Sequence, residues 1–487
     1  MPLRWPDALL MLALAGFGAQ GQMLELCDQL VTSPAGDSPL ALARYQAQLV
    51  RLQDQLRALP QPGEHQANCY HKVSRALARF SGQRNLPLPL LSAQADYLLM
   101  AQDNRRAIQI NRERCQRAGM QGEQARVLPL SKREVGRYLF QAADSSCARS
   151  VWLAWQNRGG DQADSKLAEI LTLSHQQARS MGYPSTLAWR LDGAYLNSYP
   201  QAEQFLSGLV ATATPLPWQR PNTPRYRYID PPRLARATLM QLTRLLGLSL
   251  QPLGPDQWQL WDGRRYLGQL GLIPGDRSHY WPVQRHLVGH FTGMGQILYR
   301  QNERWRGEHL SELVASITEA LYHLAGHSLA HYRAEEQEPD LAGLPRAIGL
   351  ALGAEPGFVR LLPQAPDVEP LAFGPGELLR ARLALAFWHQ ASHQPARLDR
   401  YQAGLFARYY GQPAPQGWKP LSAYPNLVEQ GPLIYGSLLA KKTAMDLIDQ
   451  WRSGSVSGPQ LWEQLFVNSN HRAFAPSLAQ LGLGQRQ

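Results

Sequence analysis

The sequence predicts a mainly α-helical protein with one small antiparallel sheet. Apolar residues recur at helical spacing in most of the chain, whereas residues 257–273 hold two aromatic-containing runs around Asp262-Gly263, a pattern typical of a β-hairpin. The chain has 487 residues, of which 44% are hydrophobic and 18% charged, a globular composition with room for two or three domains or one lobed domain. The segments with helical spacing are 38–60, 64–82, 91–118, 150–212, 231–246, 309–334, 377–395, 398–410 and 430–452.

The first 21 residues have the pattern of a signal peptide. Arg4 gives a short positive segment, residues 8–19 form an apolar run, and Ala19 and Gly21 are small residues at the −3 and −1 positions of a cleavage site before Gln22. The run is short for a bilayer span of about 20 residues. We therefore expect a periplasmic or secreted protein without a transmembrane segment after signal removal. A buried helix or an uncleaved anchor is the alternative.

The cysteines agree with export. The chain has four, Cys27, Cys69, Cys115 and Cys147, and all lie in the first third. An even number without a CxxC motif favours two disulfides in an oxidising compartment over a zinc–thiolate site. Three pairings are open, and sequential pairing is only a first guess. We interpret residues 22–150 as an N-terminal helical region tied by disulfides.

The charge is basic but evenly spread. The formal net charge is +11 and the pI is about 9.6, yet no long Lys/Arg run and no nucleic-acid-binding motif is present. We therefore expect no nucleic-acid partner. Binding to anionic surfaces stays open.

The main chemical signal is the segment LYHLAGH at residues 321–327. His323 and His327 are four residues apart on an expected helix, so both imidazoles share one face and could bind one Zn²⁺. In the hydrolytic motif HExxH, the Glu between the ligands is the general base that activates the metal-bound water. Here Leu324 occupies that position, and a leucine cannot accept a proton.

Five segments in the same order resemble the thimet oligopeptidase family of zinc metallopeptidases, including its oligopeptidase A and oligoendopeptidase F branches. The last of them, the expected zinc helix, also has Glu319 where the family often has a Glu four residues before the first His. The other four are LTLSHQQARSMGYPSTLA at 171–188, YPQAEQFLSGL at 199–209, YIDP at 228–231 with LTRLLGL at 242–248, and DG at 262–263 with LGQLGLIPGDR at 267–277. The resemblance implies a two-lobed, mainly helical metallopeptidase fold with a deep cleft, here over residues 151–487.

The resemblance also shows which zinc ligand this chain lacks. The family's third ligand is a Glu about 25 residues after the second His, which falls on Leu352 without gaps or on Arg360 after realignment. Glu355 lies nearby and, like Glu319, is a candidate substitute. Two His alone bind zinc poorly, because zinc sites normally use three or four protein ligands. We expect zinc to be absent or weakly bound.

This chain also lacks part of the family's substrate-binding stretch. It aligns with residues 424–438, where its His falls on Pro425 or Asn426 and only Tyr435 remains of its paired tyrosines. In the family these groups bind the peptide and stabilise the oxyanion. Tyr435 and Asn426 are therefore the candidate substrate-binding residues.

Because the base, the third ligand and much of the oxyanion apparatus are missing together, the sequence predicts an exported pseudopeptidase. It would bind oligopeptides or a protein partner in the cleft. Two alternatives stay open: an active zinc oligopeptidase that uses Glu319 or Glu355 instead, and a basic structural protein of the cell envelope.

Overall fold

The structure is a computed structural model of the whole chain. It describes residues 88–102, 107–109, 127–142, 144–212, 215–219, 226–284, 293–325, 338–362, 371–390, 394–468 and 474–483, and a few single positions between 49 and 73. Everything below concerns these residues.

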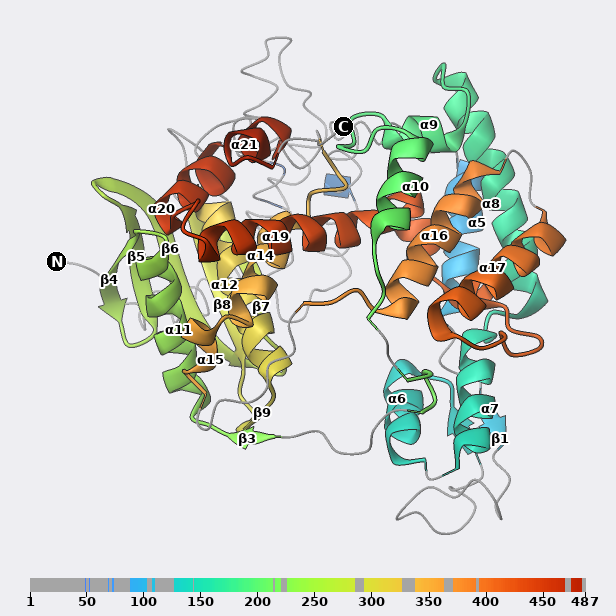
Figure 1. Ribbon diagram of the computed structural model, residues 1–487, viewed down its shortest axis with the longest axis horizontal. Helices are drawn as coiled ribbons and strands as arrows, with labels where there is room; N and C mark the ends of the chain where they lie inside the picture. Colours follow the sequence, from blue (N-terminus) through green and yellow to red (C-terminus); the bar gives the residue numbers. More distant parts are fainter. Residues whose placement is uncertain are drawn as a thin grey trace.

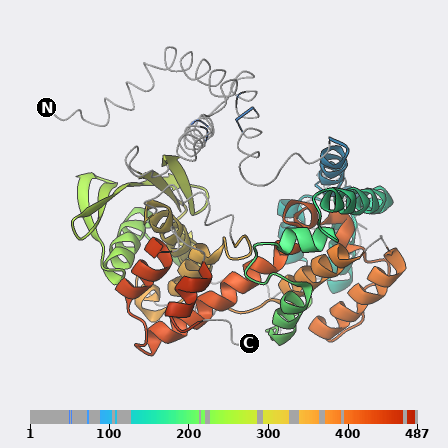
Figure 2. The ribbon, with the colours of Figure 1, turned by 90° about the horizontal axis from the view of Figure 1, so that it is seen from above.

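The helices form two lobes, which Figure 1 and the view from above in Figure 2 both show side by side. The first lobe contains α5 (Leu88–Ala101), α8 (Gly160–Ser180), α9 (Thr186–Leu191), α10 (Tyr199–Gly208), α16 (Pro375–His389) and α17 (Pro395–Tyr410). At its end lie α6 (Lys132–Gln141), α7 (Ser145–Gln156) and a hairpin of β1 (Ala107–Gln109) and β2 (Val127–Pro129). The mainly helical, lobed architecture confirms the predicted fold class.

The second lobe joins helices to a sheet. Its helices are α11 (Pro231–Leu245), α12 (Gly307–Ala325), α14 (Leu344–Gly353), α15 (Pro356–Val359), α20 (Gly458–Leu461) and α21 (Phe474–Gln480). The long helix α19 (Gly436–Arg452) runs between the lobes. Short helical turns complete the chain at η2 (Pro420–Ala423), α18 (Asn426–Glu429), η3 (Gly431–Tyr435) and η4 (Trp462–Val467). One contiguous cluster of buried apolar side chains extends through both lobes, so they share a core.

The sheet of the second lobe has five strands in the order β4-β5-β6-β8-β7. The predicted hairpin is confirmed as β5 and β6, closed by Gly263 in the left-handed region at φ 56°. The sheet is mixed, however, because β8 runs parallel to β6. This departs from the purely antiparallel prediction. A hairpin is signalled by adjacent residues, whereas the pairing of β8 with β6 joins segments that are distant in the sequence. The strands are β4 (Ser249–Gly254), β5 (Gln257–Asp262), β6 (Arg265–Gly275), β7 (His279–Gln284) and β8 (Gly293–Arg300).

Helix α12 is the centre of the second lobe. It packs on β7 and β8 with one side and on α14 with another. The two helices approach closely because Gly349 of α14 faces α12. A Cβ at this position would lie 2.4 Å from the Cα of Ala315 and 2.6 Å from Oγ1 of Thr318. Gly353 likewise faces Ser311. The helices are therefore antiparallel, and the end of α14 lies beside the start of α12.

Most predicted helices within the described residues are confirmed, with shifted ends. The helices predicted over 38–60 and 64–82 lie outside the described residues, apart from single positions. The break predicted near Gly182 separates α8 from α9, where Gly182 has φ 87°. The helix predicted over 231–246 is α11, whose first turn holds two prolines and which Gly247 ends at φ 79°. The helix predicted over 91–118 is wrong beyond α5, because residues 107–109 pair with 127–129 as a strand. The helix predicted from 430 begins as α19 at residue 436, after a turn of 3-10 helix.

The predicted disulfides and membrane spans can be compared with the described residues. Cys69 and Cys147 are both disulfide-bonded, whereas Cys27 and Cys115 lie outside the described residues, so the pairing stays a prediction. Within the described ranges, we find no helix with the length and apolarity needed to cross a bilayer. The signal peptide also lies outside those ranges and stays a prediction.

Candidate functional site

The last turn of α12 presents His323 to the edge of the sheet. The ring of His323 is partly exposed and stacks on the ring of Tyr280 from β7, with centroids 5.2 Å apart and planes at 18°. Tyr322 contacts it edge-on at 5.6 Å. Strand β7 is an edge strand of the five-stranded sheet, so this histidine lies beside a sheet edge. His327 lies outside the described residues, and the predicted histidine pair stays untested.

Leu324, at the position of the general base, points into the core. Its side chain is 1% exposed and packs on β6 at Gly268, where a Cβ would lie 2.9 Å from Cδ2 of Leu324. The same Cβ would lie 2.3 Å from the carbonyl oxygen of Gly293, so only glycine fits at position 268. Leu324 thus fills a gap in the helix–sheet packing. A carboxylate there would be buried without water, at a high desolvation cost.

The two candidate substitutes for the missing acidic groups are both engaged by arginine. Glu319 lies one turn before His323 and forms an ion pair with Arg346 of α14 at 3.4 Å. Glu355 is 4% exposed and binds Arg452 of α19 through contacts of 2.5 and 3.1 Å. The antiparallel packing of α14 on α12 puts Glu355 beside the start of α12, whereas His323 lies in its last turn. The structure does not bring Glu355 and His323 together.

The described residues therefore do not fit a hydrolytic zinc. Zinc needs at least three nitrogen, sulfur or oxygen ligands at about 2 Å. Among the residues the structure describes, no three His, Cys, Asp or Glu side chains gather in that way. The carboxylate nearest His323 along α12 belongs to Glu319, which Arg346 holds. We derive no step through a metal.

Tyr435, predicted to bind substrate, has a structural contact instead. Its side chain is fully buried, and its hydroxyl donates to the carboxylate of Asp340 at 3.0 Å. Burial and the Asp340 charge raise the pKa of Tyr435 well above its ordinary value. Asp340, 1% exposed, also accepts the backbone N–H groups of Tyr195 and Leu196 at 2.8 and 3.0 Å. We call this the Asp340 junction, because it ties α9–α10, the start of α14 and the start of α19 together.

Asn426, the other predicted substrate-binding residue, lies on the surface. It is exposed at the start of the short helix α18, and its carbonyl accepts the N–H of Gln430 at 2.9 Å. Asn426 is thus exposed whereas Tyr435 is buried, although the short helices that hold them are in contact.

A small pocket beside His323 was not predicted. It has a volume of about 350 Å³ and is lined by His279, Tyr280, Trp281 and Pro282 of β7. Atom Nδ1 of His279 is buried and has no hydrogen-bond partner within the described part of the chain. No local sequence pattern predicts this pocket, because nothing near Tyr280 shows that it lies against a helix far along the chain.

The comparisons with known proteins support the fold. No protein-family model matches the chain, and no curated protein does. Among solved structures, the chain resembles a protein of Chlamydophila abortus inferred to be a peptidase, with a TM-score of 0.52 and 11% identity over 98% of this chain and 87% of that one. The chain has a peptidase-like fold.

Other solved structures with this peptidase-like fold align less well. An M32 carboxypeptidase of Deinococcus radiodurans R1 has 12% identity and a TM-score of 0.46, in an alignment that covers 95% of each of the two chains. Oligoendopeptidase-F of Enterococcus faecium has 9% identity and a TM-score of 0.45, over 99% of this chain and 89% of that one. At such identities the likeness concerns the fold alone, and function must be argued from the residues.

Proposed function

We propose that this protein is an exported, non-hydrolysing relative of the metallopeptidases that binds peptides. The observation that carries the proposal is Leu324: the position that needs a general base holds a leucine that is 1% exposed and packed on Gly268. Hydrolysis at a zinc helix requires a group there that takes a proton from water. A buried leucine excludes both the proton transfer and the water.

The surroundings support the loss of hydrolysis. Glu319 and Glu355, the acidic side chains that could replace the lost groups, are each bound by an arginine. Freeing Glu355 would leave a buried charge unpaired and cost about 3 kcal/mol or more. The Glu319 pair is partly exposed and contributes about 1 kcal/mol or less. The ion pairs are more consistent with a structural role than with metal binding.

The edge strand β7 supports a peptide as the ligand. A peptide can extend an exposed sheet edge by backbone hydrogen bonds, while pockets along the edge receive its side chains. The pocket of His279, Tyr280, Trp281 and Pro282 lies on this strand, and His323 adds a ring stacked on Tyr280. We infer that peptides lie along β7, with an apolar or aromatic side chain in this pocket.

The first experiment measures zinc content and peptide cleavage in the same sample. Protein purified from the exported fraction without added zinc is tested against a quenched fluorescent peptide library. We expect less than about a tenth of an equivalent of zinc and no cleavage. Near-stoichiometric zinc with cleavage that disappears in His323→Ala would refute the proposal and favour an active zinc oligopeptidase.

The second experiment tests binding with the same library. Removal of the Trp281 side chain should weaken the binding of retained peptides, because Trp281 lines the pocket on β7. Trp258 is the matched control, since it lies on β5 and does not line the pocket. Equal loss in Trp281→Ala and Trp258→Ala would contradict a site on β7. Binding only to anionic surfaces, lost at high salt, would favour the envelope protein instead.

Export is tested separately. The mature protein should begin at Gln22 and lie outside the cytoplasm, which N-terminal sequencing of the fractionated protein would establish. The oxidised state of Cys69 and Cys147 supports this location. An intact N-terminus in the cytoplasmic fraction would refute export and leave peptide binding untouched.

A further inference from the structure

Strands β3 (Arg227–Tyr228) and β9 (Arg304–Trp305) form a short antiparallel ladder just before α12. Residues opposite each other in such a ladder share a face, and neighbours along one strand alternate between the two faces. Tyr228 is opposite Arg304, whose guanidinium lies 5.6 Å from the Tyr228 ring centroid, and both side chains are exposed. Arg227 is opposite Trp305, which is fully buried. Arg227 and Trp305 therefore lie on the inner face of the ladder.

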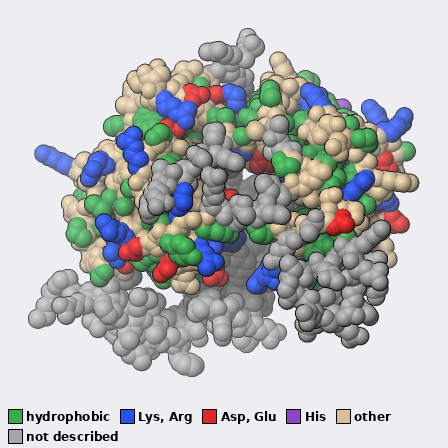
Figure 3. Space-filling view, turned by 60° about the horizontal axis from the view of Figure 1, so that its bottom comes forward, with side chains coloured by type: hydrophobic (Ala, Val, Ile, Leu, Met, Phe, Trp, Pro, Cys, Tyr) green, Lys and Arg blue, Asp and Glu red, His purple; other side chains and the backbone are tan. Residues whose placement is uncertain are grey.

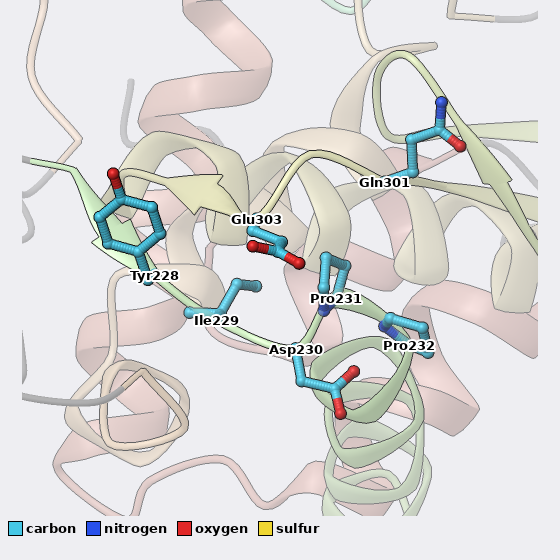
Figure 4. Close-up of a pocket in the computed structure, with 7 residues that line it drawn as sticks. All are labelled: Tyr228, Ile229, Asp230, Pro231, Pro232, Gln301 and Glu303. Atoms are coloured by element: carbon cyan, nitrogen blue, oxygen red, sulfur yellow. The ribbon is translucent and has the colours of Figure 1, made fainter.

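The acidic side chains near this ladder do not pair with its inner face. Tyr228 lines an open pocket before α11, in which Figure 4 shows the carboxylates of Asp230 and Glu303 pointing to different sides. Neither carboxylate forms an ion pair with Arg227 in the described ranges. The inner face thus needs an acceptor from another source.

The inner face holds N–H donors without acceptors. Atoms Nε1 of Trp305 and Nε of Arg227 are buried, and neither has a hydrogen-bond partner in the part of the chain that the structure describes. The same is true of Nε of Arg300 at the end of β8, whose backbone N–H donates to Oγ of Ser278 at 3.4 Å. Buried donors in proteins almost always have an acceptor. Three partnerless donors in neighbouring elements therefore indicate an acceptor that the chain does not supply.

These donors are gathered at the first turn of α12. The indole of Trp305 meets the ring of His309 at a right angle, with centroids 6.0 Å apart and planes at 88°. Burial lowers the pKa of His309, and the charges of Arg300 and Arg306 add to this effect, so both arginines act on the same turn. The start of a 19-residue helix adds its own positive partial charge. The place therefore favours a negative ligand.

The carboxylates of α12 do not satisfy the donors. Glu308 is 59% exposed and pairs with Arg306, which also lies over the exposed ring of Tyr226. Glu312, one turn later, is partly buried. Burial raises the pKa of Glu312, and the charges of Arg346 and Arg300 oppose this only in part. Among the described side chains, neither glutamate forms an ion pair with Arg300.

We propose that the first turn of α12 binds a small anion, which is either a halide or an oxyanion such as phosphate or a carboxylate. The anion would accept hydrogen bonds from Arg227, Arg300 and Trp305 and face the positive end of the helix. It would join β3, β8 and β9 to α12 and so stabilise the second lobe. Because a helix of 19 residues is about 28 Å long, this site is separate from the peptide site proposed at His323 and β7.

The test follows thermal unfolding of the full chain with added anions. Sodium chloride, phosphate and acetate are each titrated to about 20 mM, with the ionic strength held constant by the bulky anion gluconate. We expect at least one small anion to raise the Tm by about 2 °C or more, because a ligand of the folded state stabilises it. The anion with the largest effect at equal concentration identifies the source. Equal Tm values in all the salts would overturn the proposal and assign the donors to ordered water.

Matched variants locate the site. Trp305→Phe keeps a ring in the core and removes one N–H, and Arg300→Gln removes one charge. Each should raise the anion concentration for half of the Tm shift by about 10-fold. Because the shift is measured within each variant, a lower starting Tm does not affect the comparison, and Arg227→Gln replaces Trp305→Phe if that variant does not fold.

Two control variants leave the site intact. Arg304→Gln changes the outer face of the same ladder, and Trp418→Phe removes a buried, partnerless N–H that packs on Trp152 in the first lobe. Both should respond to anions as the native protein does. An unchanged response in Arg300→Gln and Trp305→Phe, or an equal loss in Arg304→Gln, would overturn the proposal.

Discussion

Acidification should destabilise the second lobe through His309. This residue lies in the first turn of α12, is 8% exposed, and accepts the backbone N–H of Arg306 with Nδ1 at 3.1 Å. Burial, together with the charges of Arg300 and Arg306, lowers the pKa of His309 from 6.5 to about 4. Glu308 approaches Nε2 at 3.7 Å, but it is 59% exposed and cannot offset burial and two arginines.

The sign and size follow from linkage. Because the folded pKa of His309 is depressed, the neutral ring stabilises the fold fully above about pH 6.5, and this stability is lost as the pH falls towards 4. Lowering the pKa from 6.5 to about 4, at about 1.36 kcal/mol for each pH unit, amounts to about 3 kcal/mol. Below about pH 4 the folded protein binds the proton too, and the His309 contribution should fall no further.

The assay compares denaturant unfolding of the native protein and His309→Gln across this range. A glutamine in the first turn can still accept the N–H before the helix but does not titrate. From pH 7 to pH 4 the native protein should therefore lose about 3 kcal/mol more unfolding free energy than His309→Gln. A difference that stays constant with pH would refute the burial of a neutral His309.

Three further substitutions test the packing. Gly349→Ala should lower the unfolding free energy by about 1–3 kcal/mol, because its methyl group meets the backbone of Ala315; full stability would mean that α12 and α14 lie further apart. Asp340→Asn should cost about 2–4 kcal/mol in the same measurement, since an amide accepts fewer bonds from Tyr435 and the backbone; a neutral effect would contradict the Asp340 junction. Leu324→Glu should destabilise the protein by about 3 kcal/mol or more, whereas Leu324→Met stays within about 1.5 kcal/mol. Peptide cleavage by the Glu variant would show that only the base is missing.

The fold could be predicted where signals are local. Pro231, Asp230 and Gly247 mark both ends of α11, and Gly263 closes the hairpin, because caps and turns depend on a few adjacent residues. The parallel pairing of β8 with β6 could not be predicted, since it depends on contacts between distant segments. The strand at 107–109 was missed for the same reason, as its partner lies at 127–129.

The candidate site was predictable in its chemistry and less so in its geometry. Leu324 identifies the missing base from sequence alone, but its packing on Gly268 needs the structure. The aligned motif predicts Tyr435 as a substrate-binding residue, yet Tyr435 lies in the core, because an alignment gives a residue type and not the direction of its side chain. On the face that Figure 3 shows, the visible Lys and Arg side chains are spread over both lobes. Pairing of Glu355 with Arg452 had no sequence signal, since Glu355 precedes α15 and Arg452 ends α19, far along the chain.

The path of the chain between the lobes has a consequence for how the protein can be made. The first lobe takes its helices from residues 88–208 and 375–410, and the second from 231–359 and 458–480, so neither is a continuous piece of the polypeptide. During synthesis, part of the apolar core of the second lobe stays uncovered until α20 and α21 have been made. No single cut yields a complete lobe, and a fragment ending before η3 would leave Asp340 without the hydroxyl of Tyr435. Expression of separate halves should therefore give soluble material only when both halves are produced together and can complement each other.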